Sequence, residues 1–233
     1  MRRNIVIITA AGAGKRMGSS KKKQYIKLLN EPILYYTFKT FVEHPQIDTI
    51  IPVIPKDDLD IFNEIIIERF NSSKINSPVF GGKERQDSVY NGLKSIAKSL
   101  IDSIVLIHDG VRPFISSEII SRSIESMSTH KASIVGVKVK DTLKLFSGEE
   151  VRETINRSRV VSVQTPQTFI VKDILSSYKK AEEKSFRGTD DASLFEKFGN
   201  GNIKIVEGSY NNIKITTSED LIFGEAILKN FKT

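Results

Sequence analysis

Glycine, lysine and arginine residues are concentrated in one short stretch near the start of the sequence. Residues 10–18 read Ala-Ala-Gly-Ala-Gly-Lys-Arg-Met-Gly, and three lysines follow at 21–23. Glycine lets backbone N–H groups turn toward an anion, while Lys15 and Arg16 add full positive charge. This combination predicts a phosphate-binding loop rather than a tight turn that binds no ligand.

Two widespread phosphate-binding motifs do not account for this stretch. The dinucleotide-binding pattern G-x-G-x-x-G needs a glycine at position 17, which is Met17. The Walker A pattern needs a glycine at position 9 and a hydroxyl residue at position 16, which are Thr9 and Arg16. The predicted loop therefore belongs to another kind of phosphate-binding protein.

The surrounding elements predict a single α/β domain over residues 1–233. Short runs of β-branched residues predict strands at 5–8, 49–54, 79–80 and 104–107. Apolar residues recur at helical spacing between them, as at Phe62, Ile65, Ile66 and Phe70, and later helices are predicted at 171–183 and 218–229. This alternation predicts a mostly parallel, twisted sheet with helices on both faces, as in Rossmann-like folds. Ligands of such sheets bind beyond the carboxyl ends of the strands, where the loop lies.

A different pattern follows another predicted strand at 133–139. Residues 141–145 and 151–155 predict two strands joined by a turn at Ser147-Gly148, within an arm at 139–162. An isolated hairpin is only marginally stable in water. We therefore expect the β-hairpin arm to protrude, to pack on a second copy of the chain and to form a homodimer.

The composition restricts the partners of this chain. Lys and Arg total 35 against 28 Asp and Glu, and the net charge of +7 predicts anionic partners: nucleic acid, a membrane surface or phosphorylated small molecules. Crowding of the cations into one glycine-containing stretch favours a compact phosphate site. Cysteine is absent, which excludes disulfides, thiolate metal sites and a cysteine nucleophile, and is compatible with a reducing cytoplasm. No window approaches the roughly 18 apolar residues of a membrane helix, so we expect a cytoplasmic protein.

Seven short blocks, in order along nearly the whole chain, combine glycine, charged and hydroxyl residues. The first covers 10–18 and continues in Lys23-Gln24-Tyr25 and Pro32-Ile33-Leu34. The others are Gly81-Gly82-x-x-Arg85-x-x-Ser88-Val89, His108-Asp109-x-x-Arg112-Pro113, and the blocks at 141–144, 165–167, 189–192 and 212–216. Together they resemble the pattern of the 2-C-methyl-D-erythritol 4-phosphate cytidylyltransferases, the IspD family.

This resemblance implies a nucleotidyltransferase reaction. In the family, the phosphate of methylerythritol phosphate attacks the α-phosphorus of CTP, which gives 4-diphosphocytidyl-2-C-methyl-D-erythritol and pyrophosphate in isoprenoid precursor synthesis. A phosphomonoester is largely dianionic at neutral pH, because its second pKa is about 6, so the attack needs no general base. Cations are needed instead, to bring two anions together and to stabilise the charge that builds up at phosphorus.

The resemblance also implies roles for individual residues. It makes Arg16 and Lys23 catalytic, and it assigns nucleotide binding to Ala10, Ala11, Gly12, Ala13, Gly14, Lys15, Gly81, Gly82, Arg85, Ser88 and Asp109. Binding of the phosphorylated alditol falls to Thr142, Arg157, Thr165, Thr189 and Lys214, with Thr142 and Arg157 reaching the site from the arm of a partner subunit. Magnesium is expected mainly on the CTP phosphates, with Asp109 as the candidate protein ligand. Members of the family usually have proline where this chain has Lys22.

Without the resemblance, several of these residues have ordinary structural interpretations. Gly81-Gly82 and Ser88 suit a turn and a helix start, and Asp109 suits a loop cap. Lys214 is then an alternating polar residue on a strand at 213–215, and Arg157 a solvated arginine. Lys23 is a solvated lysine in a basic run.

Two other functions remain open from the sequence. A ribitol 5-phosphate cytidylyltransferase of the same fold shares the patterns at 109–114 and 164–167, but the blocks at 141–144 and 189–194 favour the methylerythritol enzymes. A basic nucleotide- or RNA-binding module also explains the net charge. RNA binders usually interleave aromatic and basic residues, whereas the glycine-rich stretch is followed by one aromatic residue, Tyr25. We therefore expect neither nucleic acid nor a membrane as a partner.

Overall fold

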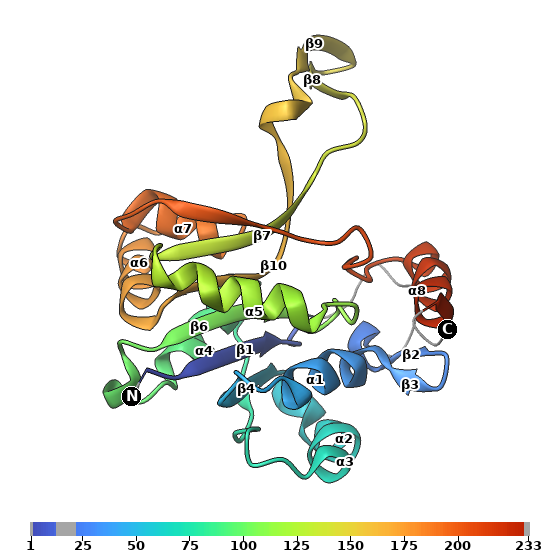
Figure 1. Ribbon diagram of the computed structural model, residues 1–233, viewed down its shortest axis with the longest axis vertical. Helices are drawn as coiled ribbons and strands as arrows, with labels where there is room; N and C mark the ends of the chain where they lie inside the picture. Colours follow the sequence, from blue (N-terminus) through green and yellow to red (C-terminus); the bar gives the residue numbers. More distant parts are fainter. Residues whose placement is uncertain (1, 13–21, 231–233) are drawn as a thin grey trace.

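Isoleucine- and valine-rich segments form the centre of a seven-stranded sheet in the computed structural model, which describes residues 2–12 and 22–230 (Figure 1). The strand order is β11-β7-β10-β6-β1-β4-β5. The strands are β1 (Asn4–Thr9), β4 (Thr49–Ile54), β5 (Val79–Phe80), β6 (Ile104–Asp109), β7 (Ala132–Lys138), β10 (Val161–Ile170) and β11 (Ile203–Glu207). Within this sheet β10 pairs antiparallel with β6 and β7, and the other pairings are parallel. The predicted α/β fold with a mostly parallel sheet is confirmed.

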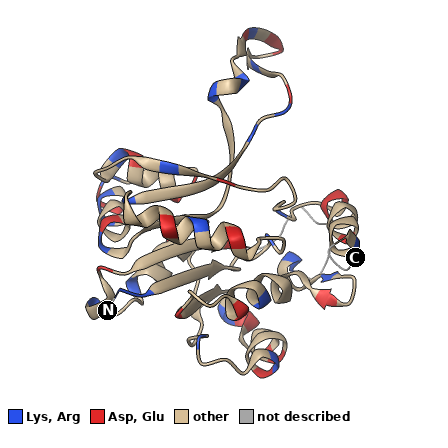
Figure 2. Cartoon of the chain, viewed as in Figure 1, with Lys and Arg blue, Asp and Glu red and all other residues tan. Residues whose placement is uncertain are grey.

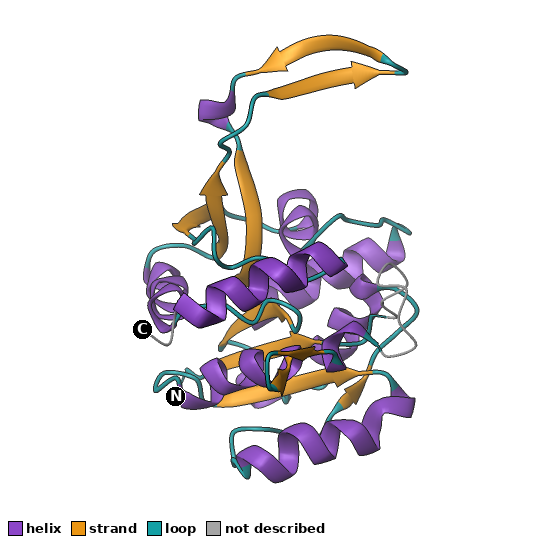
Figure 3. Ribbon diagram, turned by 90° about the vertical axis from the view of Figure 1, so that its right-hand side faces the viewer, coloured by secondary structure: helices purple, strands orange, loops and turns teal. Residues whose placement is uncertain are grey.

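Helices cover both faces of the sheet (Figure 3). Alternate residues of β1 point to opposite faces, so Val6 and Ile8 belong to one core cluster while Ile5 and Ile7 belong to the other. The first cluster includes side chains of α1 (Ile33–Glu43), α2 (Leu59–Phe62), the π-helical turn η4 (Asn63–Ile67) and α5 (Ser117–Glu125). The second includes those of α4 (Arg85–Lys94), α6 (Val171–Glu183) and α7 (Asp191–Phe198). Helix α3 (Glu68–Phe70) continues η4.

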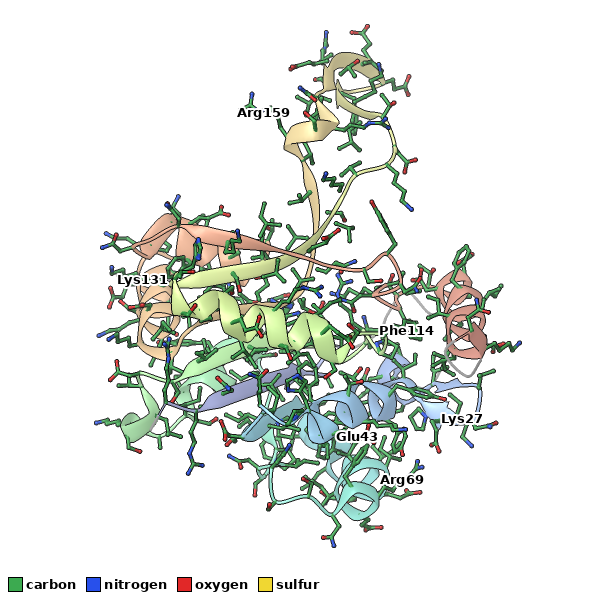
Figure 4. The ribbon with its side chains drawn as sticks, in the orientation of Figure 1. Lys27, Glu43, Arg69, Phe114, Lys131 and Arg159 are labelled. Atoms are coloured by element: carbon green, nitrogen blue, oxygen red, sulfur yellow. The ribbon has the colours of Figure 1, made fainter. Side chains whose placement is uncertain are left out.

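A smaller core cluster lies beside the carboxyl ends of the strands. Phe114, labelled in Figure 4, packs there with Leu28, Ile215 and Leu228. Leu28 belongs to the short strand β2 (Lys27–Leu28), which pairs with β3 (Glu31–Pro32), Leu228 belongs to α8 (Ser218–Asn230), and the other two lie in loops. Burial of Ile215 holds the preceding residue, Lys214, close to the end of the sheet.

The hairpin arm protrudes from the sheet, as predicted (Figures 1 and 3). Its strands are β8 (Leu143–Ser147) and β9 (Glu150–Ile155), so the first strand begins two residues later than predicted. Gly148 takes a φ of 62° in the turn, a value that glycine adopts without steric cost. Phe146 and Val151 are 74% and 62% exposed on the arm. Packing of these side chains on a second copy of the chain stays a prediction.

Several expectations for the second half of the chain need correction. The segment 213–215 is irregular rather than a strand, because Ile215 donates one backbone hydrogen bond to Val111 and joins no ladder. Strands β10 and β11 were not predicted. The helices predicted at 171–183 and 218–229 are confirmed as α6 and α8.

Charged side chains of both signs are spread over the outer helices and the arm, whereas the central strands carry few of them (Figure 2). Within residues 2–12 and 22–230, every helix is too short or too polar to cross a bilayer.

Candidate active site

A cavity of about 590 Å³ opens at the carboxyl ends of β1 and β6, beside the first turn of α4. Because β1 and β6 are adjacent and parallel, their ends and the loops that follow them meet at one edge of the sheet. The cavity is lined by Thr9, Ala10, Ala11, Gly12, Lys23, Gln24, Gly82, Lys83, Glu84, Arg85, Ser88, Asp109, Val111, Lys214 and Thr216.

Glycines form a closely packed floor between β1 and α4. A Cβ atom on Gly81 would lie 2.4 Å from the Ala11 Cβ, and one on Gly82 would lie 2.4 Å from the Asp87 Cβ. The Gly82 N–H donates to the Ser88 Oγ at 3.0 Å, and that hydroxyl donates to the Glu84 carbonyl at 3.0 Å. Backbone can therefore approach a flat ligand closely here, while Ser88 also serves the turn.

Asp109 is the anionic centre of the cavity wall. It ends β6 and is 5% exposed. Its Oδ1 lies 3.1 Å from the Arg85 Nε, and its Oδ2 lies 2.8 Å from the Lys214 Nζ and 3.7 Å from the Arg112 Nε. Burial acts to raise the pKa of Asp109, but Arg85, Lys214 and Arg112 outweigh it and hold that pKa well below its usual range. The carboxylate therefore stays ionised and keeps the three cations together.

A second carboxylate, that of Asp191, also binds the Arg85 guanidinium. The Arg85 guanidinium makes two hydrogen bonds to Asp191, of 3.0 and 2.9 Å, and Asp191 is fully buried. The Tyr178 hydroxyl donates to the same carboxylate. Burial disfavours the charge on Arg85, but Asp191 and Asp109 outweigh it and raise the pKa of Arg85 well above its usual value. Arg85 is therefore a fixed cation between two buried anions.

His108 belongs to a buried network behind the wall and does not face a reacting group. The Thr165 Oγ1 lies 3.0 Å from the His108 Nδ1 and accepts the Asp109 N–H at 3.1 Å. The His108 Nε2 lies 3.2 Å from the Arg112 carbonyl. Burial lowers the pKa of His108 to about 4, so the ring is neutral at physiological pH. This histidine orders the Asp109 loop.

Lys23 enters the cavity from a short turn. It begins the 3₁₀ helix η2 (Lys23–Tyr25) and lines the cavity together with Asp109. The side chain of the next residue, Gln24, donates to the Ala10 carbonyl at 2.8 Å. The side chain of the preceding residue, Lys22, makes an ion pair with Asp58. Of these two lysines, Lys23 is the one that lines the cavity.

Comparisons with known proteins identify the family of this chain. The family model for 2-C-methyl-D-erythritol 4-phosphate cytidylyltransferase, IspD, matches residues 4–230. The chain belongs to the IspD family. Relatives of that name from Clostridium botulinum strain Langeland and Clostridioides difficile strain 630 are each 46% identical, over 98% and 96% of this chain and 99% and 92% of theirs.

Solved structures of IspD proteins have the same fold. A 4-diphosphocytidyl-2C-methyl-D-erythritol synthase from Anaerococcus prevotii aligns with a TM-score of 0.87 at 41% identity, covering 98% of this chain and 96% of that one. An IspD from Francisella tularensis aligns with a TM-score of 0.81 at 32% identity, covering 96% and 99%. The Rossmann-like nucleotidyltransferase fold implied by the sequence is therefore confirmed.

The structure brings together part of the site that the IspD resemblance implies. Nine of the implied residues line one cavity: Ala10, Ala11, Gly12, Lys23, Gly82, Arg85, Ser88, Asp109 and Lys214. Lys214 also makes an ion pair with Asp109. Ala13, Gly14, Lys15 and Arg16 lie outside the described residues, so their roles stay predictions. Gly81 lies under the floor, against Ala11.

The other implied alditol-binding residues do not line this cavity. Thr165 is 4% exposed, and its hydroxyl is engaged with His108 and the Asp109 N–H. Thr189 lies outside the cavity lining, near the end of the loop that leads into α7. Thr142 and Arg157 belong to the protruding arm, where the Arg157 guanidinium donates to the Lys140 carbonyl. Their contact with a substrate stays a prediction that involves a partner subunit.

Sequence reasoning assigned no role to Asp191 or Tyr178. Asp191 stood within the quoted block at 189–192, but its partner Arg85 is 106 residues away in the chain. The block contains two adjacent aspartates, and one of them, Asp190, caps α7 by accepting the Ser193 N–H. The second aspartate, Asp191, is not needed for that cap, and this is the signal that could have pointed to another role. Tyr178 gave no sequence signal beyond the apolar face of α6.

Among the described residues, Asp109 and Glu84 are the carboxylates that line the cavity, and Asp109 is the candidate metal ligand that the resemblance implies. Within that part of the chain, no three His, Asp or Glu side chains converge. Both Asp109 oxygens face cations, yet the carboxylate is ionised and lines the cavity. A magnesium ion held mainly by nucleotide phosphates and water is compatible with this donor set.

Proposed function

We propose that this chain transfers the cytidylyl group of CTP to 2-C-methyl-D-erythritol 4-phosphate and releases pyrophosphate. The observation that carries the proposal is one cavity at the carboxyl ends of the strands, lined by a glycine floor, Lys23 and Lys214, in a chain of the IspD family. The acceptor phosphate attacks the α-phosphorus, a new P–O bond forms, and the bond to the pyrophosphate oxygen breaks.

In this proposal, the positively charged side chains of the cavity bind the phosphate groups and stabilise the charge that develops on them. Lys23 stabilises the charge that accumulates at the α-phosphorus and on the departing pyrophosphate, together with Arg16. Lys214 binds the phosphate of the alditol. Asp109 holds Lys214, Arg85 and Arg112 in place before either substrate arrives, which reduces the rearrangement needed on binding.

Nucleotide recognition is assigned to the other side of the cavity. The floor around Gly82 and the first turn of α4 admits the flat cytosine ring close to backbone N–H and C=O groups. Ser88 lies beside this floor and orders it through the Gly82 N–H. A ring held against backbone groups is recognised by its hydrogen-bonding edge, which differs between cytosine and the other bases.

Magnesium, a homodimer and a cytoplasmic location complete the proposal. Bound magnesium would neutralise phosphate charge, with Asp109 as its candidate protein contact. The exposed apolar residues of the arm support packing against a second copy, which would bring Thr142 and Arg157 to the partner's cavity. The cysteine-free composition is compatible with a reducing cytoplasm.

Pyrophosphate release tests the proposal directly. The purified chain is incubated with magnesium, each of the four nucleoside triphosphates, and either methylerythritol phosphate or ribitol 5-phosphate. Release with CTP and methylerythritol phosphate alone is the expected result. Release with ribitol 5-phosphate would show that this alditol phosphate is the acceptor substrate. RNA binding without pyrophosphate release would show that the chain is a binding module and not an enzyme.

A further inference from the structure

Lys22, the residue that precedes Lys23, makes an ion pair with a turn that follows strand β4. The Lys22 ammonium donates to the Oδ1 of Asp58. Asp58 ends the short 3₁₀ helix η3 (Lys56–Asp58), which follows β4 (Thr49–Ile54). The Asp58 side chain is 7% exposed and that of Lys22 is 34% exposed. This ion pair therefore joins the start of the Lys23 turn to the region beyond β4.

The other neighbour of Lys23 is anchored to β1. Gln24 is 1% exposed, and its side chain donates to the Ala10 carbonyl directly after β1. The Tyr25 N–H donates to the Lys22 carbonyl at 3.0 Å and closes the backbone turn around Lys23. Lys23 is thus held between two anchored residues, and its own side chain lines the cavity.

The environment of Asp58 makes this anchor depend on Lys22. The hydroxyl of the buried Tyr25, the last residue of the turn, lies near the Asp58 carboxylate. Burial, followed by the charge of Asp58 and by hydrogen bonding to it, raises the pKa of Tyr25 well above its usual value. A buried carboxylate is costly without a cation, so removal of Lys22 or of the Asp58 charge disturbs the contact from either side.

We propose that Asp58 is a positioning residue, which acts through Lys22 to aim the Lys23 turn at the phosphates of the nucleotide. The proposal rests on the proposed function, because it assigns a role to Lys23 in that reaction. It also explains why neighbouring lysines are not interchangeable: Lys22 is occupied by Asp58 while Lys23 faces the cavity.

The backbone angles of Lys22 suggest a variant that keeps the position of the Lys23 turn but removes the charge of Lys22. Lys22 has φ −62° and ψ 136°, and a proline ring fixes φ at about −65°. Lys22→Pro can therefore replace the restraint of the ion pair by a covalent restraint of the same backbone angle. In that background the Asp58 carboxylate is no longer needed.

The test is a double-mutant cycle on pyrophosphate release. Lys22→Ala and Asp58→Asn are each expected to lower kcat roughly tenfold, with a smaller change in the KM for CTP, because Lys23 is misplaced. Lys22→Ala/Asp58→Asn should be no worse than either single variant, since both remove the same contact. Lys22→Pro/Asp58→Asn should recover kcat, and its kcat should respond less to added salt than that of the unmodified chain.

An exposed ion pair provides the matched control. Lys172 and Asp102 are 2.7 Å apart and are 54% and 74% exposed, and Asp102 lies before β6, at the end of that strand opposite to Asp109. Asp102→Asn should leave kcat unchanged. Thermal unfolding of all variants distinguishes misplacement of Lys23 from loss of folded protein. If Asp58 had a purely structural role, its loss would lower the unfolding temperature but not the kcat of the folded fraction.

Lysine acetylation, read by mass spectrometry, keeps this inference separate from the proposed function. CTP should protect Lys23 in the unmodified chain, and the protection should weaken in Asp58→Asn and return in Lys22→Pro/Asp58→Asn. An active chain whose Asp58→Asn variant has unchanged kcat and Lys23 protection overturns the positioning role alone. A chain that shows this protection pattern without methylerythritol-dependent turnover keeps the positioning role and overturns the proposed function. Absence of CTP protection at Lys23 in the unmodified chain overturns the positioning role, while methylerythritol-dependent pyrophosphate release still decides the proposed function.

Discussion

Asp109 shows how a buried carboxylate can organise cations without taking part in bond making. Its two oxygens hold Arg85 and Lys214, and Arg112 lies slightly farther away. In the proposed reaction, an incoming phosphate would compete with Asp109 for Lys214, which is paired before the substrate binds. Lys23 lines the same cavity and is proposed to contact the nucleotide phosphates.

Lys23→Ala tests the catalytic role at this scale. The proposed function assigns Lys23 to charge that develops during the reaction, so kcat should fall roughly 10²–10³-fold while the KM for CTP changes far less. Steady-state pyrophosphate release measures both constants. Lys27→Ala, at an exposed position of β2, is the matched control and should behave like the unmodified chain. An unchanged kcat in Lys23→Ala would remove this lysine from the mechanism.

His108 makes the stability of the chain depend on pH. Its pKa is about 4 in the folded state and 6.5 when unperturbed, so the unfolded chain takes up a proton first as the pH falls. The free energy of unfolding should therefore drop by about 3 kcal/mol between pH 6.5 and 4 from this residue. His44, whose pKa is also lowered by burial, acts in the same direction. Asp109 contributes in the same sense only near and below its unperturbed value of 3.8.

Urea unfolding at several pH values measures this dependence. His108→Gln should flatten the slope between pH 6.5 and 4, since it removes the group that titrates differently in the two states. His130→Gln, at a partly exposed position, should retain the full slope. Equal slopes in His108→Gln and the unmodified chain would show that other groups cause the acid sensitivity.

At the scale of elements, the contact between the end of β1 and the start of α4 shapes the nucleotide side of the cavity. Gly81→Ala would place a methyl group 2.4 Å from the Ala11 Cβ and 2.9 Å from the Ser88 Oγ. The floor must then shift, and the KM for CTP should rise by roughly tenfold, together with a loss of about 1–3 kcal/mol in unfolding free energy. Gly136→Ala on β7, where the nearest atom is 3.4 Å away, is the control for a glycine without this crowding. A CTP titration that is the same in both variants would contradict the proposed position of the base.

The elements differ in how well their sequence patterns predicted them. Strands β1, β4 and β6 are short runs of apolar β-branched residues, and burial on both faces keeps such runs apolar. Strand β10 contains Gln164, Pro166 and Gln167 and was missed, because its polar side chains are buried and bond to distant segments, Gln164 to the Ser209 carbonyl and Gln167 to Asp190. The segment 213–215 alternates like a strand, yet its isoleucines pack in the small cluster beside α8. Local alternation alone cannot distinguish these two environments.

The candidate site was predictable where a motif carried several of its residues together. The glycine pair, Arg85 and Ser88 formed one block, and the structure places Gly82, Arg85 and Ser88 at the cavity with Gly81 directly beneath its floor. The pairing of Lys22 with Asp58 and that of Arg85 with Asp191 depend on tertiary contacts between distant segments. No local pattern encodes those partners.

At the scale of the whole molecule, the arm has the exposed apolar surface expected of an interface. Phe146→Asp should weaken the proposed dimer at least tenfold, since it puts a charge where an apolar contact is expected. Sedimentation velocity measures the dimer, and activity should fall in parallel at low protein concentration, because Thr142 and Arg157 are proposed to act in the partner's cavity. Ile61→Asp on α2, 40% exposed and distant from the arm, should leave association unchanged (Figure 1). A monomeric unmodified chain with full activity would contradict the role of the arm.

The strand order also has a consequence for the chain as it leaves the ribosome. Strands β1, β4, β5 and β6 all lie before residue 110, whereas β10 begins at Val161. At roughly 5–20 residues per second, the parallel half of the sheet can assemble while its later neighbour is still being translated. During those seconds the apolar β6 is an unpaired edge, a template for pairing with another nascent chain. Arrival of the antiparallel β10 both seals that edge and brings Thr165 against His108, so protection of β6 and the ordering of the Asp109 loop come in one step.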